Sequence, residues 1–335
     1  MDRSSPRIPR ITVLGGGTGT FTVLTGLKTH PVELAAVVSS ADDGGSTGVL
    51  RDELGVLPPG DIRQCLVALS SADEIMRRVF NYRFTRGPFN GHPLGNIFIS
   101  ALEDLCGNPI EAVRQAHQIL RVRGRVIPVS STASNLYAQL ADKTVVQGEH
   151  AIDDSTCNRA AIESCFLDPP VEANPDALDA IRDADVLVMG PGDLYTSTIP
   201  VLLVDGVSHA VAECRGKRVL VTNLMTKRGQ TDGYSARRFV EAVERVLAPG
   251  RIDAVILNAE RPPQDIIDRY AAVNEHPVED DLGDDPRAIR VPLISKRLAK
   301  QTAGDALRRS VLRHDSDRLA TTIVGLLGET VDERR

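Results

Sequence analysis

Three glycine-bearing loops carry most of the polar residues that are suited to binding a phosphate-containing ligand. The first loop lies between an apolar run and a predicted helix and contains Gly15, Gly16, Gly17, Thr18 and Gly19. Bare backbone N–H groups at the positive end of a helix bind phosphate, because glycine lets the ligand approach and the helix dipole favours negative charge. The spacing is neither G-x-G-x-x-G, which would need glycine in place of Thr20, nor a P-loop. A tight turn that needs glycine for packing alone is the alternative interpretation.

Two further polar loops, at residues 190–198 and 223–234, follow predicted buried strands. The loop at 190–198 offers backbone, hydroxyl and aromatic groups, from Gly190, Gly192, Tyr195, Thr196 and Ser197. The loop that begins at Asn223 mixes cationic side chains with glycine, which suits an anionic ligand. Because ligands of open α/β sheets bind outside the carboxyl ends of the strands, these loops predict one shared crevice.

Carboxylates near these loops are candidate ligands of a hard cation. Asp42 and Asp43 follow the second predicted strand, where dinucleotide-binding units carry the acid that reads the ribose. Asp61 begins a predicted helix, so it is either an N-cap or, with Asp42 or Asp43, a ligand of Mg²⁺ that bridges phosphates. Asn96 precedes an apolar helix and is predicted to be a cap or a ligand contact.

The elements that must position these loops are short strands alternating with helices. Apolar runs without polar alternation predict buried strands at residues 11–14, 34–38, 186–189, 219–222 and 254–257. Apolar stripes at helical spacing predict helices over residues 239–247 and 319–327. Shorter strand candidates at 125–129, 136–140 and 144–147, with a turn at 141–143, predict a small antiparallel insertion at about residues 125–160.

We therefore expect an α/β protein with a Rossmann-like, doubly wound and mainly parallel sheet, helices on both faces and that insertion. Residues 11–328 are predicted to form a single domain, between a flexible segment at 1–10 and a polar tail at 329–335.

Composition excludes several classes of protein. The chain has 335 residues, a formal net charge of −6 and 4% aromatic residues without tryptophan. A nucleic-acid partner is therefore not expected, since such proteins carry a basic face or stacking aromatics. No run of 18 apolar residues occurs, so no membrane span is expected. The five cysteines (Cys65, Cys106, Cys157, Cys165 and Cys214) are scattered, which favours packing roles and a cytoplasmic location over disulfides or zinc. A homodimer with an isologous interface is the expected assembly, because it is the commonest oligomeric state of soluble proteins.

Seven sequence blocks occur in the order found in one known family, and they span residues 10–325. These blocks are residues 14–19, 41–46, 51–61, 91–96, 190–197, 223–234 and 313–315. They resemble the YvcK-type branch, also called gluconeogenesis factors, of the 2-phospho-L-lactate transferase (CofD-like) family. The resemblance implies a Rossmann-like fold that binds a UDP-sugar, notably UDP-N-acetylglucosamine. It also implies a regulatory role in central carbon metabolism, cell shape and cell-wall precursor supply, with no established reaction.

The other branch of the same family supplies the alternative function. Its members are Mg²⁺-dependent transferases that move a phospholactyl or phosphoenolpyruvyl group from a guanylylated donor to a deazaflavin, in coenzyme F420 biosynthesis. Matching that branch implies Asp43 and Asp61 as the metal-associated acids. The first loop of this chain departs from that branch. The transferases have a more glycine-rich turn with a lysine nearby, and this chain has residues 18–21 in its place. A binding protein is therefore favoured over an enzyme, and an NAD(P)-dependent oxidoreductase ranks last because no Tyr-Lys or His constellation is evident.

The resemblance also extends to two residues outside the glycine loops, and it fails at one residue within them. Tyr270 and Arg313 match positions of UDP-sugar-binding residues; an Arg can pair with a diphosphate and a Tyr can pack on uracil or sugar. The alternatives are an exposed helical tyrosine and a surface arginine. Asp193 stands where the family often has serine, and its charge would repel a phosphate unless a cation or a sugar intervenes.

Overall fold

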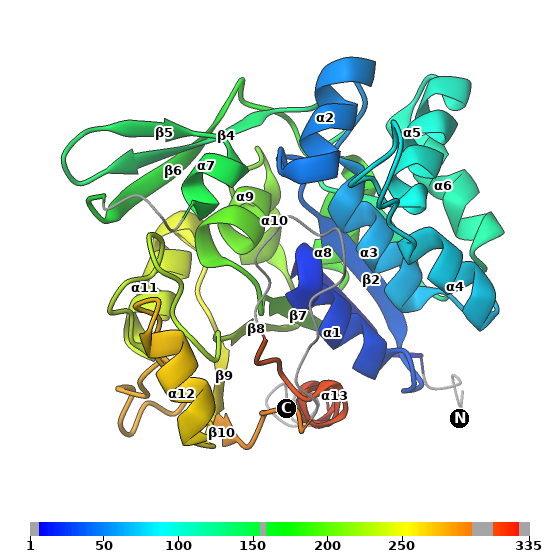
Figure 1. The fold of residues 1–335 in the computed structure, drawn as a ribbon. Helices are drawn as coiled ribbons and strands as arrows, with labels where there is room; N and C mark the ends of the chain where they lie inside the picture. Colours follow the sequence, from blue (N-terminus) through cyan, green and yellow to red (C-terminus); the bar gives the residue numbers. More distant parts are fainter. Residues whose placement is uncertain (1–6, 155–158, 297–310, 328–335) are drawn as a thin grey trace, which may run out of the picture.

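The main sheet of the protein contains seven parallel strands (Figure 1). The computed structural model describes residues 7–154, 159–296 and 311–327. The strand order is β10-β9-β8-β7-β1-β2-β3, which is the order of dinucleotide-binding sheets with one strand added at an edge. The strands are β1 (Arg10–Gly15), β2 (Glu33–Val38), β3 (Arg125–Pro128), β7 (Val186–Met189), β8 (Lys217–Val221), β9 (Ala254–Asn258) and β10 (Ala288–Val291).

Helices cover both faces of this sheet, because successive strand residues point to opposite sides. Val13 packs with one apolar cluster and Leu14 with the other. One face carries helices α1 (Gly17–Leu27), α3 (Pro59–Leu69), α5 (Leu94–Cys106), α6 (Pro109–Ile119) and α13 (Ser316–Gly325). The other carries α8 (Pro175–Arg182), α9 (Ile199–Leu202), α10 (Val207–Glu213) and α11 (Ala236–Leu247). The predicted doubly wound α/β fold is confirmed.

The remaining elements lie around the carboxyl ends and edges of the strands. They are α2 (Gly45–Leu54), α4 (Glu74–Asn81), α7 (Glu149–Asp153), α12 (Gln264–Ala271) and a π-helical turn, η1 (Leu194–Thr198). No helix in the described ranges is long and apolar enough to cross a membrane.

The antiparallel insertion exists, but its predicted start was wrong. The predicted strand at 125–129 is β3, which pairs in parallel with β2 in the main sheet. Its residues after Arg125 are buried without alternation, as a strand inside a parallel sheet requires. The insertion itself is a sheet in the order β5-β4-β6, formed by β4 (Asn135–Leu140), β5 (Val145–Gln147) and β6 (Ile162–Asp168). It therefore begins later and ends later than predicted.

The predicted alternation in β4 is confirmed, because Leu136, Ala138 and Leu140 are buried while the residues between them are half-buried.

The expectation of a flexible segment at residues 1–10 is corrected in part: Arg10 begins β1, and Arg7 forms an ion pair with Asp185 at 2.5 Å. Residues 1–6, the tail at 329–335 and Cys157 lie outside the described residues. Cys65, Cys106, Cys165 and Cys214 are free thiols.

Candidate functional site

The two principal glycine loops meet at the point where the strand order reverses. β1 and β7 are neighbours in the sheet, but the chain continues from β1 to β2 on one side and from β7 to β8 on the other. The loops that follow β1 and β7 are in direct contact, since a Cβ built on Gly19 would lie 1.8 Å from the carbonyl oxygen of Pro191. Such a reversal opens a crevice at the carboxyl ends of the strands, where doubly wound folds bind ligands.

Two backbone features of the first loop require glycine. Gly17 has a φ of 65° at the first position of α1, and such a left-handed conformation strains other residues. At Gly16 a Cβ would lie 1.8 Å from Oδ2 of Asp61. Gly16 is the N-cap of α1, and no hydrogen bond from its own side chain is possible there. The first N–H groups of α1 are therefore well suited to an anionic ligand.

Asp61 faces this loop from helix α3. The structure contradicts its predicted N-cap role, because the N-cap of α3 is Pro58 and Asp61 is the third residue of the helix. The physical reason is the proline pair at 58–59, since proline favours the first helical position and the helix starts at Pro59, three residues earlier than an N-cap at Asp61 would place it. The Asp61 side chain is buried, and its carboxylate lies against Gly16 and Gly17.

Asp42 and Asp43 point to different partners. Burial and the nearby Asp61 carboxylate raise the pKa of Asp42 to about 7, although its Oδ1 accepts the Gly44 N–H at 2.8 Å. Asp43 instead accepts the backbone N–H of His150, in the first turn of α7, at 2.8 Å. The carboxylate beside Asp61 is thus that of Asp42, whereas the carboxylate of Asp43 holds the start of a helix.

Glu149, at the start of α7, adds a carboxylate that the sequence analysis missed. Its pKa is raised by burial and by the charges of Asp42, Asp153 and Asp61. Within the described residues, no group of three or more His, Cys, Asp or Glu side chains is arranged to hold a metal ion. A divalent cation near Asp42 and Asp61 would therefore need oxygen ligands from phosphate as well, which is the usual mode of Mg²⁺ binding.

Lys227 neutralises Asp193, the acid whose charge would disfavour a phosphate. Lys227 Nζ lies 2.6 Å from Asp193 and 2.8 Å from Asp153. Burial alone would lower the pKa of Lys227, but the two carboxylates outweigh it and the pKa is raised. Asp153 also accepts hydrogen bonds from Thr196 Oγ1, at 3.1 Å, and from Gln230 Nε2. The loops after β7 and β8 are thereby joined through α7.

Asn96 is held by side chains rather than acting as a helix cap. The N-cap of α5 is Pro93, so the cap alternative for Asn96 is wrong. The Asn96 side chain accepts from Arg63 Nε at 2.8 Å and donates to Ser46 Oγ at 3.2 Å. Ser46 Oγ in turn lies 2.9 Å from Nδ1 of His92. This network joins α2, α3 and α5 beside the acid pair.

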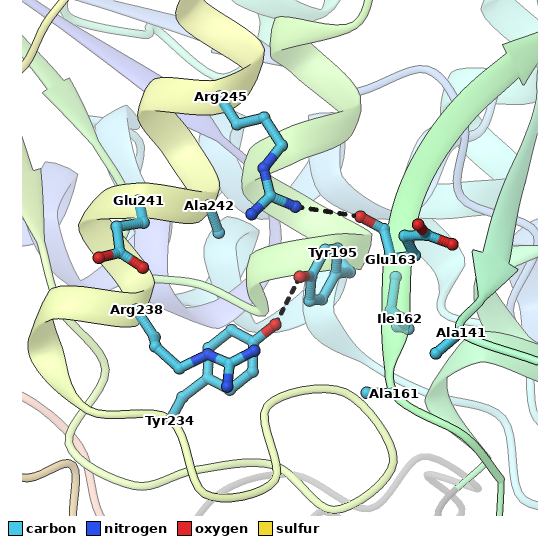
Figure 2. A pocket seen from close by; sticks show the side chains of 10 residues that line it. All are labelled: Ala141, Ala161, Ile162, Glu163, Tyr195, Tyr234, Arg238, Glu241, Ala242 and Arg245. Atoms are coloured by element: carbon cyan, nitrogen blue, oxygen red, sulfur yellow. Dashed lines mark hydrogen bonds between the residues drawn. The ribbon is translucent and has the colours of Figure 1, made fainter.

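The remaining predicted residues of the second and third loops differ in exposure. Tyr195 is buried, and its hydroxyl forms a hydrogen bond with the hydroxyl of Tyr234 at 2.7 Å. Both tyrosines line a cavity of about 310 Å³ between β6 and α11 (Figure 2). Ser197 is closer to the crevice, because a Cβ on Gly17 would lie 4.0 Å from its Oγ. Asn223 is half-buried just beyond β8.

Tyr270 and Arg313 are brought together at the carboxyl end of β8. The hydroxyl of Tyr270 accepts the N–H groups of Val311 and Leu312 at 2.9 and 3.0 Å. Tyr270 is buried in an apolar cluster with Leu224 and Met225 of the third loop, so the alternative of an exposed helical tyrosine is wrong. Arg313 follows these two anchored residues, and Tyr270 therefore positions the segment that carries it.

Comparison with known proteins gives a consistent result. The family model described as 2-phospho-L-lactate transferase CofD matches residues 11–299. The gluconeogenesis factor of Bacillus subtilis is 36% identical over 323 residues, which cover 96% of this chain and 99% of that protein. The gluconeogenesis factor of Halalkalibacterium halodurans is 36% identical over 319 residues, covering 94% of this chain and 95% of the relative.

A longer relative and a crystal structure extend the comparison. A protein of Nostoc is 41% identical over 274 residues, which are 81% of this chain and only 60% of that protein. A crystal structure of a member of the UPF0052 family from Bacillus halodurans is similar with a TM-score of 0.88 and 34% identity, covering 96% of this chain and 100% of that one.

Proposed function

Because this chain belongs to the CofD family and matches the gluconeogenesis factor of Bacillus subtilis over 99% of that protein, we propose that it is a regulatory protein that binds a UDP-sugar. UDP-N-acetylglucosamine is the candidate that the family resemblance implies. Its proposed role is to link the supply of this cell-wall precursor, and with it cell shape, to central carbon metabolism.

The contact between the two glycine loops is the observation that carries the proposal. The N–H groups at the start of α1 and the N–H of Gly192 border one crevice, and glycine leaves the backbone bare on both sides. Pro191 has no N–H, and the Gly190 N–H donates to the carbonyl oxygen of Leu14 at 3.3 Å. A diphosphate fits such a site without a net positive protein charge, because N–H groups and the helix dipole supply the attraction. The ion pair of Lys227 with Asp193 removes the unfavourable charge of that acid.

The proposed cation site consists of Asp61 with an acid of the loop after β2. The family resemblance implies Asp43 and Asp61, but the geometry favours Asp42 over Asp43, because the Asp43 carboxylate accepts a hydrogen bond from the backbone N–H of His150 in α7. Mg²⁺, when bound, would neutralise the diphosphate. The residues of this chain would orient the diphosphate, and the charge of a bound cation would favour the ionised form of both carboxylates.

Arg313 is the proposed contact for the sugar-linked phosphate, and Tyr270 is its positioning residue. The Tyr270 hydroxyl fixes the backbone of residues 311 and 312. The backbone from which the Arg313 side chain extends is therefore held in place. A planar guanidinium pairs with two phosphate oxygens at once.

Calorimetric titration with UDP-N-acetylglucosamine, UDP, N-acetylglucosamine and GDP, each with and without Mg²⁺, tests the proposal. We expect the UDP-sugar to bind most tightly. Gly19→Ala should weaken binding at least tenfold, because its Cβ would displace the carbonyl of Pro191. Gly325→Ala is the matched helical control, since a Cβ there meets nothing within 4 Å.

Two outcomes would contradict the proposal. Preferred binding of GDP together with transfer to a deazaflavin would assign the transferase activity instead. Equal affinity of wild type and Gly19→Ala, at unchanged thermal stability, would remove the crevice from ligand binding.

A further inference from the structure

A second cavity lies beside the third loop. Its volume is about 470 Å³, within the range of roughly 300–1,000 Å³ found for small-molecule sites. It is bordered by the loop residues Arg228 and Gln230, by residues 271–274 after α12, and by Arg159. It adjoins the cavity of Figure 2, because Ala161 and Tyr234 line both.

The lining of this cavity carries an excess of positive charge. Arg159 donates to the carbonyl oxygens of Ala151, at 2.7 Å, and Gly229, at 3.2 Å, so neither bond neutralises its charge. Arg228 has no hydrogen bond or ion pair within the part of the chain that the structure describes. The one carboxylate in the lining is Asp232, which accepts the Gly229 N–H at 2.7 Å. Two guanidinium groups against one carboxylate favour an anionic ligand.

A buried acceptor in the same lining calls for a hydrogen-bond donor. Gln230 is 2% exposed, and its Nε2 donates to Asp153. Its Oε1 is buried and has no hydrogen-bond partner among the described residues. Buried polar atoms are nearly always paired, so a ligand that supplies a hydroxyl would complete this one.

The same glutamine connects the cavity to the residues that join the glycine loops. Gln230 and Lys227 both bind Asp153, and Lys227 also binds Asp193 of the loop after β7. None of the glycines at 15–19 or 190–192 lines the cavity. A ligand in the cavity would therefore touch a residue that helps to hold the loops together.

We propose that this cavity is a second binding site, for a small phosphate monoester that also carries hydroxyl groups. The phosphate pairs with Arg228 and is attracted by Arg159, and a hydroxyl donates to Gln230 Oε1. Because Gln230 and Arg159 also hold α7, the second ligand stabilises the arrangement in which the glycine loops are joined.

Calorimetry with glucose 6-phosphate as the probe tests this site, with inorganic phosphate and glucose as separate arms. We expect glucose 6-phosphate to bind the full chain whether or not UDP-N-acetylglucosamine is saturating. Arg228→Ala should weaken that binding at least tenfold, and Ala272→Phe, which fills the cavity from its exposed rim, should abolish it. Arg238→Ala is the matched control, because Arg238 stacks on Tyr234 in the adjoining cavity (Figure 2) and its loss should change affinity less than twofold.

Several results would overturn the inference. These are no binding of glucose 6-phosphate to wild type, equal affinity of wild type and Arg228→Ala, or competition with UDP-N-acetylglucosamine, which would place the sugar phosphate in the crevice. Binding of inorganic phosphate as tight as that of glucose 6-phosphate would contradict the role of the hydroxyl groups. A normal UDP-sugar titration in Arg228→Ala separates these failures from failure of the proposed function.

Discussion

Three neighbouring carboxylates, those of Asp42, Asp61 and Glu149, dominate the electrostatics of the crevice. The charge of Asp61 raises the pKa of Asp42, and the charges of Asp42 and Asp61 add to the effect of burial in raising the pKa of Glu149. Burial of the Asp42 carboxyl and, after it, the charge of Asp61 disfavour the ionised form, and together they raise the pKa of Asp42 to about 7 from 3.8. The same arrangement favours a divalent cation, because its positive charge offsets the repulsion between the carboxylates.

Asp42→Asn should therefore stabilise the ligand-free protein at alkaline pH while it abolishes any Mg²⁺ dependence of UDP-sugar binding. A carboxyl whose folded-state pKa is raised contributes stability that is complete below about pH 3.8 and is lost as pH rises through about 7. At pH 8 the variant should exceed wild type by about 1 kcal/mol or more in free energy of unfolding, by urea titration.

Asp43→Asn is the matched neighbour, because the amide keeps an oxygen for the His150 N–H. It should leave the Mg²⁺ dependence intact. Loss of that dependence in Asp43→Asn, and not in Asp42→Asn, would assign the cation to Asp43.

Residue types and spacing were enough to select Asp42, Asp43 and Asp61, but not to distinguish their roles. The two aspartates are adjacent in a loop, and what separates them is a backbone bond from His150, which lies 107 residues further along the chain. Tyr270 shows the same limit, because its partners at 311 and 312 are distant in sequence and only the fold brings them to its hydroxyl. Contacts of this kind leave no local pattern.

Among the elements, α7 joins the most parts of the site despite its length of 5 residues. Asp43 accepts a hydrogen bond at its start, Asp153 binds Lys227 near its end, and Arg159 donates to its carbonyl oxygens. Sequence analysis did not predict this helix, because it is shorter than the window over which helical periodicity is visible. β3 was misplaced for a related reason: its 4 residues were grouped with the strands that follow them in the chain rather than with β2.

Asp153→Asn should weaken UDP-sugar binding about tenfold and lower the free energy of unfolding by about 1–3 kcal/mol. The amide retains one acceptor oxygen but loses the charge that pairs with Lys227, while Asp193 remains to hold the lysine. Calorimetry and urea titration measure the two effects.

Glu163→Gln, in the same insertion, is the control, because its ion pair with Lys143 is exposed and such pairs contribute roughly 0–1 kcal/mol. An unchanged UDP-sugar affinity in Asp153→Asn would restrict α7 to a structural role.

At the scale of the whole molecule, the parallel sheet and the helices on its two faces follow from patterns visible in the sequence. Each central strand is a continuous apolar run, and each is followed by a loop and a helix, so a doubly wound sheet is the economical solution. The packing of the last described helix on the first helix is less apparent from the sequence. Helix α13, from the C-terminal part of the chain, packs on α1, the first helix (Figure 1).

Gly26 of α1 is the position that permits this packing. A Cβ there would lie 2.1 Å from the carbonyl oxygen of Ser316 and 2.9 Å from the Cβ of Ala320. Gly26→Val should therefore lower the free energy of unfolding by about 2 kcal/mol or more, because overpacking a helix contact costs roughly 1–3 kcal/mol per site.

Gly325→Val is the same substitution at a helical glycine with nothing within 4 Å, and it should change stability by no more than about 0.5 kcal/mol. If α13 is an integral part of the fold, urea denaturation of Gly26→Val will still show one transition, shifted to a lower midpoint with an unchanged slope. A separate early transition, with the main one left in place, would instead show that α13 detaches independently and that the sheet folds without it.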